Sequence, residues 1–325
     1  MTRAIRIHET GGPEVLQCET VASEAPGPGE ARVRHRAIGV NFIDTYHRSG
    51  LYPLPSLPHG IGTEAAGVVE SVGPGVESPK PGDRVAYASV APGSYAEARN
   101  LPADRLVPIP EGISDEVAAS ALLKGMTVEY LVQRTHRVEP TETVLLHAAA
   151  GGVGLIACQW LKHIGATVIG TVSTEAKAEL AREYGCDHPI IHSREDFVAR
   201  VRELTGGEGV PVVYDSVGKA TFAKSLDCLR PRGLYVGFGN ASGKPEPFDM
   251  GLLAKKGSLF LTRPTLFDHI RTRPELLASA RAVFDRLEAG HLKVEVQQRW
   301  PLSEAAACHR ALEARQTRGS SILVP

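Results

Sequence analysis

The sequence predicts an α/β protein that combines a β-rich unit with a doubly wound parallel sheet. The chain has 325 residues, a length that suggests about two domains of ~150 residues each. Its first third is rich in glycine and proline, with short alternating segments and closely spaced turns. From Thr143 onward, short apolar strands alternate with helical segments. These two patterns indicate two different architectures within one chain.

Composition and charge favour a soluble globular protein. Apolar residues make up 42% of the chain and charged residues 22%, with a formal net charge of -1. This balance gives no general electrostatic reason to expect nucleic acid or an acidic membrane surface as a partner. The N-terminus lacks the apolar core of a signal peptide, and His147 and Gln159 interrupt the longest apolar run. We therefore expect a cytoplasmic protein.

The cysteines do not form a recognisable framework. They are odd in number, widely spaced and without a C-x-x-C pair: Cys18, Cys158, Cys186, Cys228 and Cys308. This pattern argues against zinc fingers and disulfides, and it favours reduced, buried thiols.

The β-rich unit is indicated by alternating segments such as ARVRHRAIGV (31–40) and EAAGVVESVG (64–73). Turns such as GPGE (27–30) and PGD (81–83) separate them. Short strands at this spacing predict a barrel-like unit. A helix is then expected from Ser114, a plausible N-cap.

The second half predicts six apolar strands separated by helices, which is typical of a parallel, doubly wound sheet. The expected strands are 144–147, 167–172, 188–192, 211–217, 233–239 and 258–261. The expected helices are 154–164, 174–184, 195–204 and 220–229. Two further helices follow Pro274, before a final strand, SSILVP. This tail looks like a return to the first unit.

A glycine turn opens the first strand–helix–strand unit. It reads Ala149, Ala150, Gly151, Gly152, Val153, Gly154, so alanine replaces the first glycine of a G-x-G-x-x-G pattern. In a dinucleotide-binding fold the second glycine lets the backbone approach the phosphates and the third lets the helix pack on the strand. A ligand-free turn is the alternative, but its place at the start of the strand–helix pattern favours a dinucleotide.

The end of the next strand indicates which dinucleotide binds. Ser173 and Thr174 occupy the place where NAD-binding folds usually carry an acidic residue, and Lys177 follows within one turn. Hydroxyls, a helix N-terminus and a lysine suit an additional phosphate, which predicts NADPH as the cofactor. Helix capping by Thr174 is an alternative role, and it is compatible with phosphate binding.

Several motifs in order resemble one family. GVNFIDTYHRSGLY, GIGTEAAGVVESVGPGV, PGDRVAY, HAAAGGVGLIACQW, VVYDSVG and RGLYVGFGN are similar to those of the zinc-free, zeta-crystallin-like NADPH:quinone oxidoreductases of the medium-chain dehydrogenase/reductase superfamily. The resemblance implies a discontinuous GroES-like catalytic domain (1–124 and 263–325) and a Rossmann NADPH-binding domain (125–262). It also implies an active site in the cleft between the domains, and a homodimer.

The resemblance excludes a catalytic zinc ion. Zinc-dependent relatives carry cysteine at the place of Asn41 and histidine at the place of Thr63, and Glu64 alone cannot hold the metal. Simple alcohol oxidation, which needs a Lewis acid on the alkoxide, is therefore not expected.

The resemblance also carries over candidate site residues. Asn41, Tyr46 and Tyr52 match positions that line the nicotinamide and substrate cleft, although both tyrosines have packing as an alternative. His192 stands where the family often has tyrosine beside the 2′-phosphate, and protonation would strengthen its phosphate contact. Lys124 lies in the helix that joins the domains, in a region that the family uses against the cofactor. The expected cofactor-binding residues are Phe42, Thr127, Tyr130, Ala150, Gly151, Gly152, Val153, Ser173, Thr174, Lys177, His192, Ser216, Phe238, Gly239 and Asn240; packing would also account for Phe42.

The implied activity is hydride transfer from NADPH to a quinone. Reduction of the conjugated double bond of an enal or enone is an alternative, because it uses the same cofactor on another electron-poor carbonyl system. A crystallin-like or RNA-binding protein without catalysis is an alternative of another class. The near-neutral charge argues against RNA, and RVRHR (32–36) alternates like a strand with one solvated face.

Overall fold

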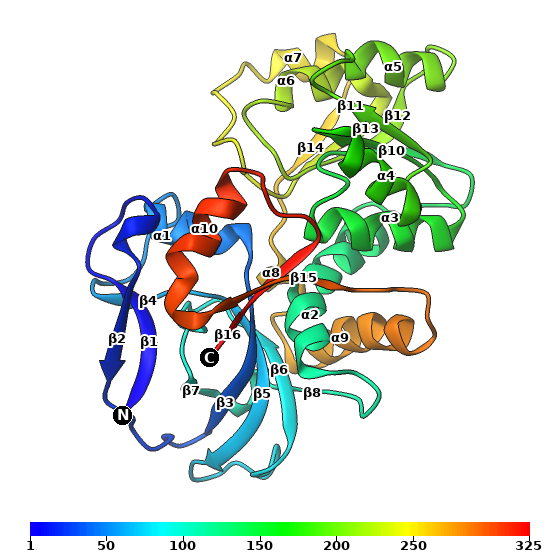
Figure 1. Cartoon of the computed structure of the whole chain (residues 1–325). Coiled ribbons are helices and arrows are strands. Elements are labelled where there is room, and N and C mark those ends of the chain that lie inside the picture. The colour runs from blue at the N-terminus through cyan, green and yellow to red at the C-terminus, as the bar shows by residue number, and fades with distance from the viewer. The chain divides into compact units, whose positions relative to one another are not determined.

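The computed structural model describes residues 1–325, which form two compact units (Figure 1). Unit 1 comprises Met1–Met126 and Ile270–Pro325, and unit 2 comprises Thr127–His269. The sequence placed these divisions at 124/125 and 262/263, whereas the units divide at 126/127 and 269/270. No helix combines the length and the apolar character needed to cross a membrane.

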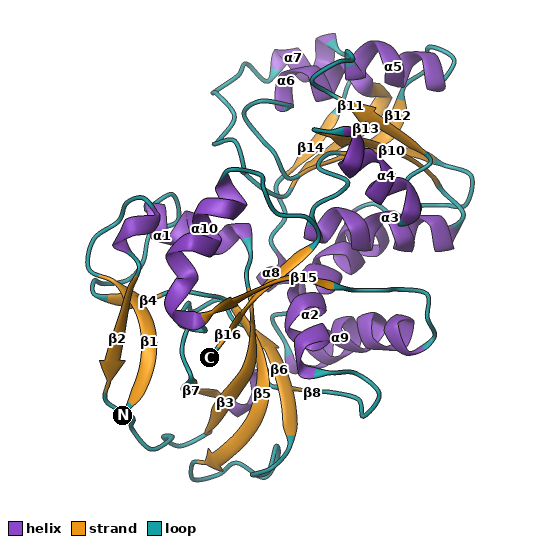
Figure 2. Cartoon of the chain, viewed as in Figure 1, coloured by secondary structure: helices purple, strands orange, loops and turns teal.

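Unit 1 is built on two sheets (Figure 2). A seven-stranded sheet has the order β15-β16-β3-β5-β6-β8, with β7 paired to β3, and a three-stranded sheet has the order β2-β1-β4. The strands are β1 (Thr2–Ile7), β2 (Gln17–Val21), β3 (Glu30–Gly39), β4 (His59–Gly60), β5 (Glu64–Val72), β6 (Arg84–Ala88), β7 (Ala98–Pro102), β8 (Val107–Pro108), β15 (Val296–Pro301) and β16 (Ser320–Val324). The helices are α1 (Phe42–Ser49), α9 (Arg273–Glu288), α10 (Ala305–Glu313) and most of α2 (Asp115–Glu129), whose last three residues belong to unit 2.

Strand β3 shows the alternation that its sequence predicts. Val33 and His35 are buried, whereas Arg34 and Arg36 are exposed. The Nε atom of Arg34 lies 2.5 Å from Glu70 of β5, so one arginine of the basic stretch forms a cross-strand ion pair.

The C-terminal strand returns to unit 1, as the sequence indicated. β16 pairs antiparallel with β3, with Leu323 opposite Ile38. Leu323 and Ile38 are fully buried in the core of the unit. Helix α2 begins as expected, because Ser114 Oγ accepts a hydrogen bond from Val117 N. The helix ends at Glu129 and continues as a π-helical segment, Tyr130–Thr135.

Unit 2 holds a six-stranded parallel sheet in the order β11-β10-β9-β12-β13-β14. The strands are β9 (Thr143–Leu146), β10 (Thr167–Val172), β11 (His188–Ile191), β12 (Val210–Asp215), β13 (Leu229–Gly237) and β14 (Phe260–Thr262). The helices are α3 (Gly152–Ile164), α4 (Glu175–Glu183), α5 (Phe197–Leu204), α6 (Phe222–Ser225), α7 (Gly251–Lys255) and α8 (Leu266–His269). The order, with β10 and β12 on opposite sides of β9, is the doubly wound topology that the sequence predicts.

One helix and one strand of unit 2 differ from expectation. The predicted helix 220–229 is only a short α6 followed by a 3-10 turn, Leu226–Cys228, and β13 begins at Leu229 instead of residue 233. The Arg202 side chain holds the observed turn, because its Nη2 donates to the carbonyl oxygens of Asp227 and Leu229 at 2.6 and 3.1 Å. A side chain from α5 therefore satisfies carbonyl oxygens that would have no intrahelical partner at the end of the expected helix.

Candidate cofactor and substrate site

The predicted cofactor residues of unit 2 lie along the carboxyl edge of its sheet. His192 follows β11, Ser173 and Thr174 follow β10, and the glycine turn follows β9. Ser216 follows β12, and Phe238–Asn240 follow β13. Because these five strands are neighbours and parallel, their ends form one continuous row. Ligands of open α/β sheets bind at this edge, beside the point where the strand order reverses, which here lies between β9 and β12.

Gly154 is required for the packing of the glycine turn. A Cβ atom at this position would lie 2.3 Å from the carbonyl oxygen of Ala148 and 2.5 Å from that of Ala149. A side chain would therefore push α3 away from the end of β9. This geometry confirms the close helix–strand approach that the sequence assigned to the third glycine.

Gly151 has a different environment. Its Cβ would meet only one atom, the carbonyl oxygen of Ala148, at 3.3 Å, and its backbone is extended. Gly151 is the N-cap of α3, and no side chain caps the first turn of this helix. The N-terminus of α3 thus presents backbone N–H groups, the arrangement that receives a phosphate in dinucleotide-binding folds.

The end of β10 and the end of β11 meet at one corner of the row. The backbone N–H of His192 donates to Val172 O at 3.1 Å, and Ser193 Oγ donates to Ser173 O at 3.4 Å. Thr174 caps α4 by accepting from the backbone N–H of Lys177 at 3.3 Å. The structure therefore brings Ser173, Thr174, Lys177 and His192 into one region, and Thr174 has the capping role as well.

Glu175 is directed into ion pairs at the same corner. Its carboxylate lies 3.3 Å from Arg194, just beyond β11, and 3.8 Å from Arg182 on its own helix. These two cations hold the acidic group on the helix instead of leaving it as a partner for a ribose hydroxyl.

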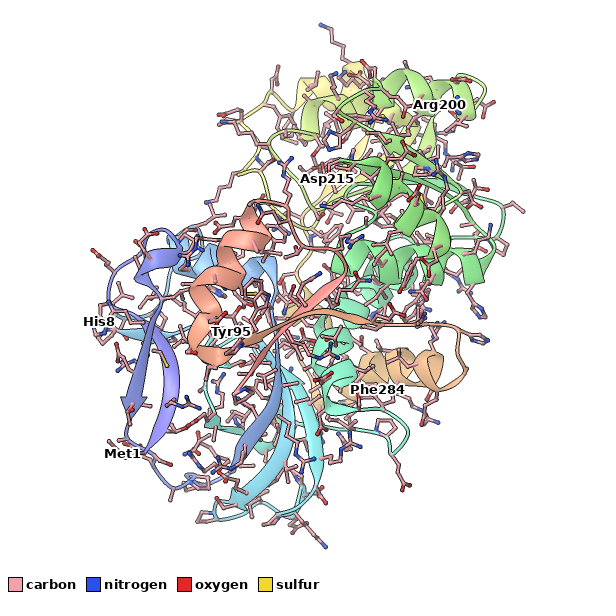
Figure 3. All side chains as sticks on the ribbon, in the orientation of Figure 1. Met1, His8, Tyr95, Arg200, Asp215 and Phe284 are labelled. Atoms are coloured by element: carbon pink, nitrogen blue, oxygen red, sulfur yellow. The ribbon has the colours of Figure 1, made fainter.

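Asp215 organises the loops at the ends of β12 and β13. It is fully buried, and its carboxylate accepts hydrogen bonds from Val217 N, Thr221 Oγ1 and Tyr235 Oη at 2.6–2.9 Å. Its backbone oxygen accepts from Phe238 N at 2.8 Å. Ser216 and Phe238 therefore lie in two loops that Asp215 joins by hydrogen bonds (Asp215 is labelled in Figure 3).

Close backbone packing joins the same two loops. A Cβ on Gly239 would lie 2.5 Å from Ser216 O, so only glycine fits there. Asn240 is buried next to Gly218.

Thr127 and Tyr130 lie where α2 passes into the π-helical segment. Thr127 is buried, and the ring of Tyr130 stacks on His269 with centroids 4.4 Å apart and planes at 6°. One face of the Tyr130 ring is therefore covered by His269, a residue of the same unit.

In unit 1, Asn41 lies at the N-terminus of α1 beside a buried charge pair. Its Nδ2 donates to Glu64 Oε2 at 2.9 Å, and Lys124 Nζ lies 3.5 Å from the same oxygen. Glu64 Oε1 accepts from Leu123 N at 2.7 Å. Burial raises the pKa of Glu64, while Lys124 and Asn41 oppose that shift.

Tyr46 and Tyr52 contact each other. Their ring centroids are 5.2 Å apart in an edge-to-face arrangement, and Tyr52 N donates to Tyr46 O at 3.0 Å. Tyr46 is buried, whereas Tyr52 and Phe42 are half-buried. The two tyrosines thus form one aromatic pair near Asn41 in the sequence, with packing between them as the sequence allowed.

The residues that stand at the zinc-ligand positions do not fit a zinc ion. The amide of Asn41 is held by Glu64, and Thr63 Oγ1 donates to Asp44 Oδ1 at 2.9 Å. No group of three or more His, Cys, Asp or Glu side chains is arranged to hold a metal. Neutral amide and hydroxyl groups are weak zinc ligands compared with thiolate and imidazole.

Sequence reasoning missed Asp44 as a member of this site. The residue is fully buried, and it accepts hydrogen bonds from Asn41 N and Tyr95 Oη as well as Thr63. An aspartate three residues after Asn41 is a local signal for helix capping, but its contacts with Thr63 and Tyr95 are visible only in the folded chain.

Comparison with known proteins agrees with this geometry. Two family models match the chain, "Alcohol dehydrogenase GroES-like domain" over residues 27–111 and "Zinc-binding dehydrogenase" over residues 152–278. A quinone oxidoreductase of Pseudomonas aeruginosa is 52% identical over 325 residues, covering 100% of both chains. A 2-haloacrylate reductase of a Burkholderia species is 49% identical over 335 residues, covering 100% of this chain and 99% of that protein.

A solved structure is similar over nearly the whole chain. The Escherichia coli quinone oxidoreductase complexed with NADPH has a TM-score of 0.98 and 51% sequence identity, covering 99% of this chain and 100% of that one. The similarity extends over both the GroES-like and the Rossmann parts, and it agrees with the motifs of the sequence. This chain therefore belongs to the quinone oxidoreductase family of the medium-chain dehydrogenase/reductase superfamily.

Proposed function

We propose that this protein transfers a hydride from NADPH to a quinone without zinc. The observation that carries the proposal is the row of strand ends in unit 2. It runs from the corner at β11 and β10, which carries hydroxyl groups and a lysine, through the glycine turn at β9, to the hydrogen-bonded loops at β12 and β13. These three regions match, in order, the three parts of NADPH that a dinucleotide-binding fold must contact: the 2′-phosphate, the pyrophosphate and the nicotinamide.

Each part of the row has a distinct task. Ser173, Thr174, Lys177 and His192 hold the 2′-phosphate through hydroxyl and cationic donors. The N-terminus of α3 holds the pyrophosphate. Ser216 and Phe238–Asn240 orient the nicotinamide end through loops that Asp215 fixes. NADPH, when bound, supplies the hydride, and the protein supplies position and electrostatics.

Unit 1 supplies the substrate contacts in this proposal. Asn41, with its amide fixed by Glu64, donates its second amide hydrogen to a carbonyl oxygen of the substrate. Tyr52 stabilises or protonates the oxygen anion that forms when a quinone accepts hydride, and water serves in the same role. Quinol anions take protons readily, so a separate acid–base dyad is not required.

Reduction of a conjugated carbon–carbon double bond is the second candidate function. The similarity to a 2-haloacrylate reductase, at 49% identity over the whole chain, favours it. In both reactions a hydride adds to an electron-poor conjugated carbonyl system, so the same positioning residues serve.

The deciding experiment measures the loss of nicotinamide absorbance with a small p-quinone, with NADPH and NADH in parallel. We expect rapid turnover with NADPH and at least about 10-fold lower kcat/KM with NADH, because an ion-assisted contact to the 2′-phosphate is worth about 1.5–3 kcal/mol. A simple enone tested under the same conditions separates the two functions. Turnover of the enone but not of the quinone would contradict the quinone assignment and leave cofactor binding intact.

We further propose a cytoplasmic homodimer. All five cysteines are free thiols, and four of them are buried, which supports a reducing compartment. The edge strand β14 exposes two consecutive apolar side chains, Phe260 (61%) and Leu261 (39%). A second copy of the same edge would cover these side chains and complete the strand's hydrogen bonding.

A further inference from the structure

A chain of buried polar side chains leads from α10 to the N-terminus of α1. Asp44, Thr63, Tyr95 and His309 are fully buried, and Arg48 is 2% exposed. They come from α1, the turn before β5, the loop between β6 and β7, and α10, all within unit 1. Tyr95 is labelled in Figure 3. Buried polar groups are costly unless each donor finds an acceptor, so the direction of every hydrogen bond is constrained.

The directions follow from Arg48. A guanidinium only donates, so His309 Nδ1, 3.2 Å from Arg48 Nη1, is the acceptor. The proton of the neutral imidazole is then on Nε2, which donates to Tyr95 Oη at 2.9 Å. Burial lowers the pKa of His309 to about 3, in agreement with a neutral ring. Glu313 fixes the outer end of the chain by binding Arg48 through both carboxylate oxygens, at 2.8 and 2.7 Å.

The chain ends on the carboxylate of Asp44. Tyr95 Oη donates to Oδ2 at 3.0 Å, and Asn41 N donates to the same oxygen at 2.8 Å. Thr63 Oγ1 donates to Oδ1 at 2.9 Å. Asp44 thus receives three hydrogen bonds and gives none, which is the pattern of an ionised carboxylate.

We propose that Asp44, held by the Arg48–His309–Tyr95 chain, is a positioning residue for the reaction, because it fixes the backbone of Asn41 while Glu64 fixes the Asn41 side chain. The inference rests on the substrate-contacting role proposed above for Asn41. Asn41 is attached to the rest of unit 1 at both ends, by its backbone N–H to Asp44 and by its amide to Glu64. If the hydrogen bond from Asn41 N to Asp44 is lost, the Asn41 amide keeps its bond to Glu64, but the Asn41 backbone can move with the start of α1.

Protonation of Asp44 breaks this arrangement. A proton on Oδ2 turns that oxygen into a donor towards Tyr95 Oη, which already accepts from His309, and the phenol proton then has no acceptor. A proton on Oδ1 similarly removes the acceptor of Thr63. Burial raises the pKa of Asp44 to about 7, and the hydrogen bonds and Lys124 oppose the shift. The other titratable groups facing it are Tyr95 and Cys308.

The effect of Asp44 protonation on turnover can be distinguished from its effect on the stability of the fold. A carboxyl whose folded pKa lies above its unfolded value binds a proton more readily in the folded state, so acidification through about pH 7 does not destabilise the fold through this group. Loss of turnover in that range would therefore arise from the displaced start of α1. We expect kcat/KM for the quinone to fall as pH decreases through about 7 without a parallel loss of NADPH affinity. The row of strand ends belongs to unit 2, and protonation of His192 strengthens the phosphate contact instead of weakening it.

Unit 1 contains a matched control. Tyr87 Oη bonds to His35 Nε2 at 2.8 Å, and His35 Nδ1 bonds to Ala96 O at 2.6 Å. Tyr87 is fully buried and His35 is 4% exposed. This tyrosine–histidine pair resembles that of Tyr95 and His309, but neither of its side chains hydrogen-bonds to Asp44 or Asn41. Tyr87→Phe and Tyr95→Phe therefore remove the same atom from two similar pairs.

The test compares Tyr95→Phe, Asp44→Asn and Tyr87→Phe in the full-length protein. Thermal melting, the Kd of NADPH and kcat/KM for a p-quinone are measured between about pH 5.5 and 8.5. This range includes the pH at which we expect Asp44 to be protonated. At the alkaline end we expect kcat/KM to fall about 10- to 100-fold in Asp44→Asn and less in Tyr95→Phe, because small displacements of positioning groups cost factors of this size. The acidic decrease should vanish in Asp44→Asn and persist in Tyr87→Phe.

Two results would overturn the inference. One is an equal change of kcat/KM in Tyr95→Phe and Tyr87→Phe. The other is an acidic profile that is the same in the wild type and in Asp44→Asn. If Asp44→Asn does not fold, the two tyrosine variants decide alone. A folded wild type that binds NADPH but does not reduce the quinone would contradict the proposed function instead, and the comparison would then be made with a conjugated enone as acceptor.

Discussion

At the scale of single residues, cofactor choice depends on a few side chains at one corner of the unit 2 sheet. Thr174 caps α4, and its capping partner is the backbone N–H of Lys177. The side chain of Lys177 is half-buried, in the first turn of that helix. Glu175 is paired with Arg194 and Arg182. The corner therefore combines a helix N-terminus with cations, which favours a phosphate over a ribose diol.

Lys177→Ala should chiefly remove the preference for NADPH. We expect the ratio of NADPH to NADH kcat/KM to fall about 10-fold, because one charge-assisted contact to the 2′-phosphate is lost. Kd values for both cofactors, measured by titration, check this. Lys162→Ala is the control. Lys162 lies in the last turn of α3, at the end opposite the glycine turn, and pairs with Asp187 at 2.5 Å. An unchanged preference in Lys177→Ala would contradict the role given to this lysine.

At the scale of elements, the β9–α3 connection has two glycines with different constraints. Gly154 is confined by backbone oxygens 2.3 and 2.5 Å from its would-be Cβ, whereas Gly151 has one neighbour at 3.3 Å. The first constraint comes from packing within unit 2. The second is a single tight contact, which a methyl group could fit with a shift of a few tenths of an ångström. We therefore attribute the glycine at residue 151 to the approach of the cofactor.

Alanine substitutions should separate these constraints. Gly154→Ala should destabilise the protein by about 1–3 kcal/mol, the usual cost of overpacking, and also weaken NADPH binding. Gly151→Ala should cost less than about 1 kcal/mol and still weaken NADPH binding, because its methyl group occupies the phosphate approach. Denaturant unfolding without cofactor and NADPH titration provide the two values. Equal destabilisation by both variants, with normal NADPH binding in Gly151→Ala, would contradict this division of roles.

At the scale of the whole molecule, the last strand of each unit has a different place in its sheet. In unit 1 the C-terminal strand β16 lies between β15 and β3 in the large sheet. In unit 2 the last strand, β14, pairs only with β13, and it exposes Phe260 and Leu261. An apolar edge strand of this kind invites pairing with a second strand.

The protein should sediment at about twice its chain mass of 34.7 kDa. The double substitution Phe260→Asp and Leu261→Asp should shift it towards the single chain, because two negative charges would face each other across the β14 edges. Val90→Asp is the control, since Val90 is an exposed apolar residue of unit 1 at 70%. Analytical ultracentrifugation gives the masses. A dimer that persists in the double variant would place the interface elsewhere.

Features that depend on neighbouring residues could be predicted from the sequence. The alternation of strands and helices in unit 2, the solvated face of β3 and the capping roles of Ser114 and Thr174 follow from local periodicity and short-range hydrogen bonds. The glycine turn was also recognisable, because its motif is contiguous. The start of β13 was not, because Arg202 binds the carbonyl oxygen of Leu229 from 27 positions away.

The contacts between buried polar groups, in contrast, are visible only in the folded chain. Asp44 and Tyr95 are 51 positions apart, and Tyr95 and His309 are 214 apart. Each of these residues taken alone has a local explanation: a helix-capping aspartate, a core tyrosine, a helical histidine. Their connection to Asn41 arises because folding removes water from all of them at once, and a buried donor must then find its acceptor on whichever element lies opposite.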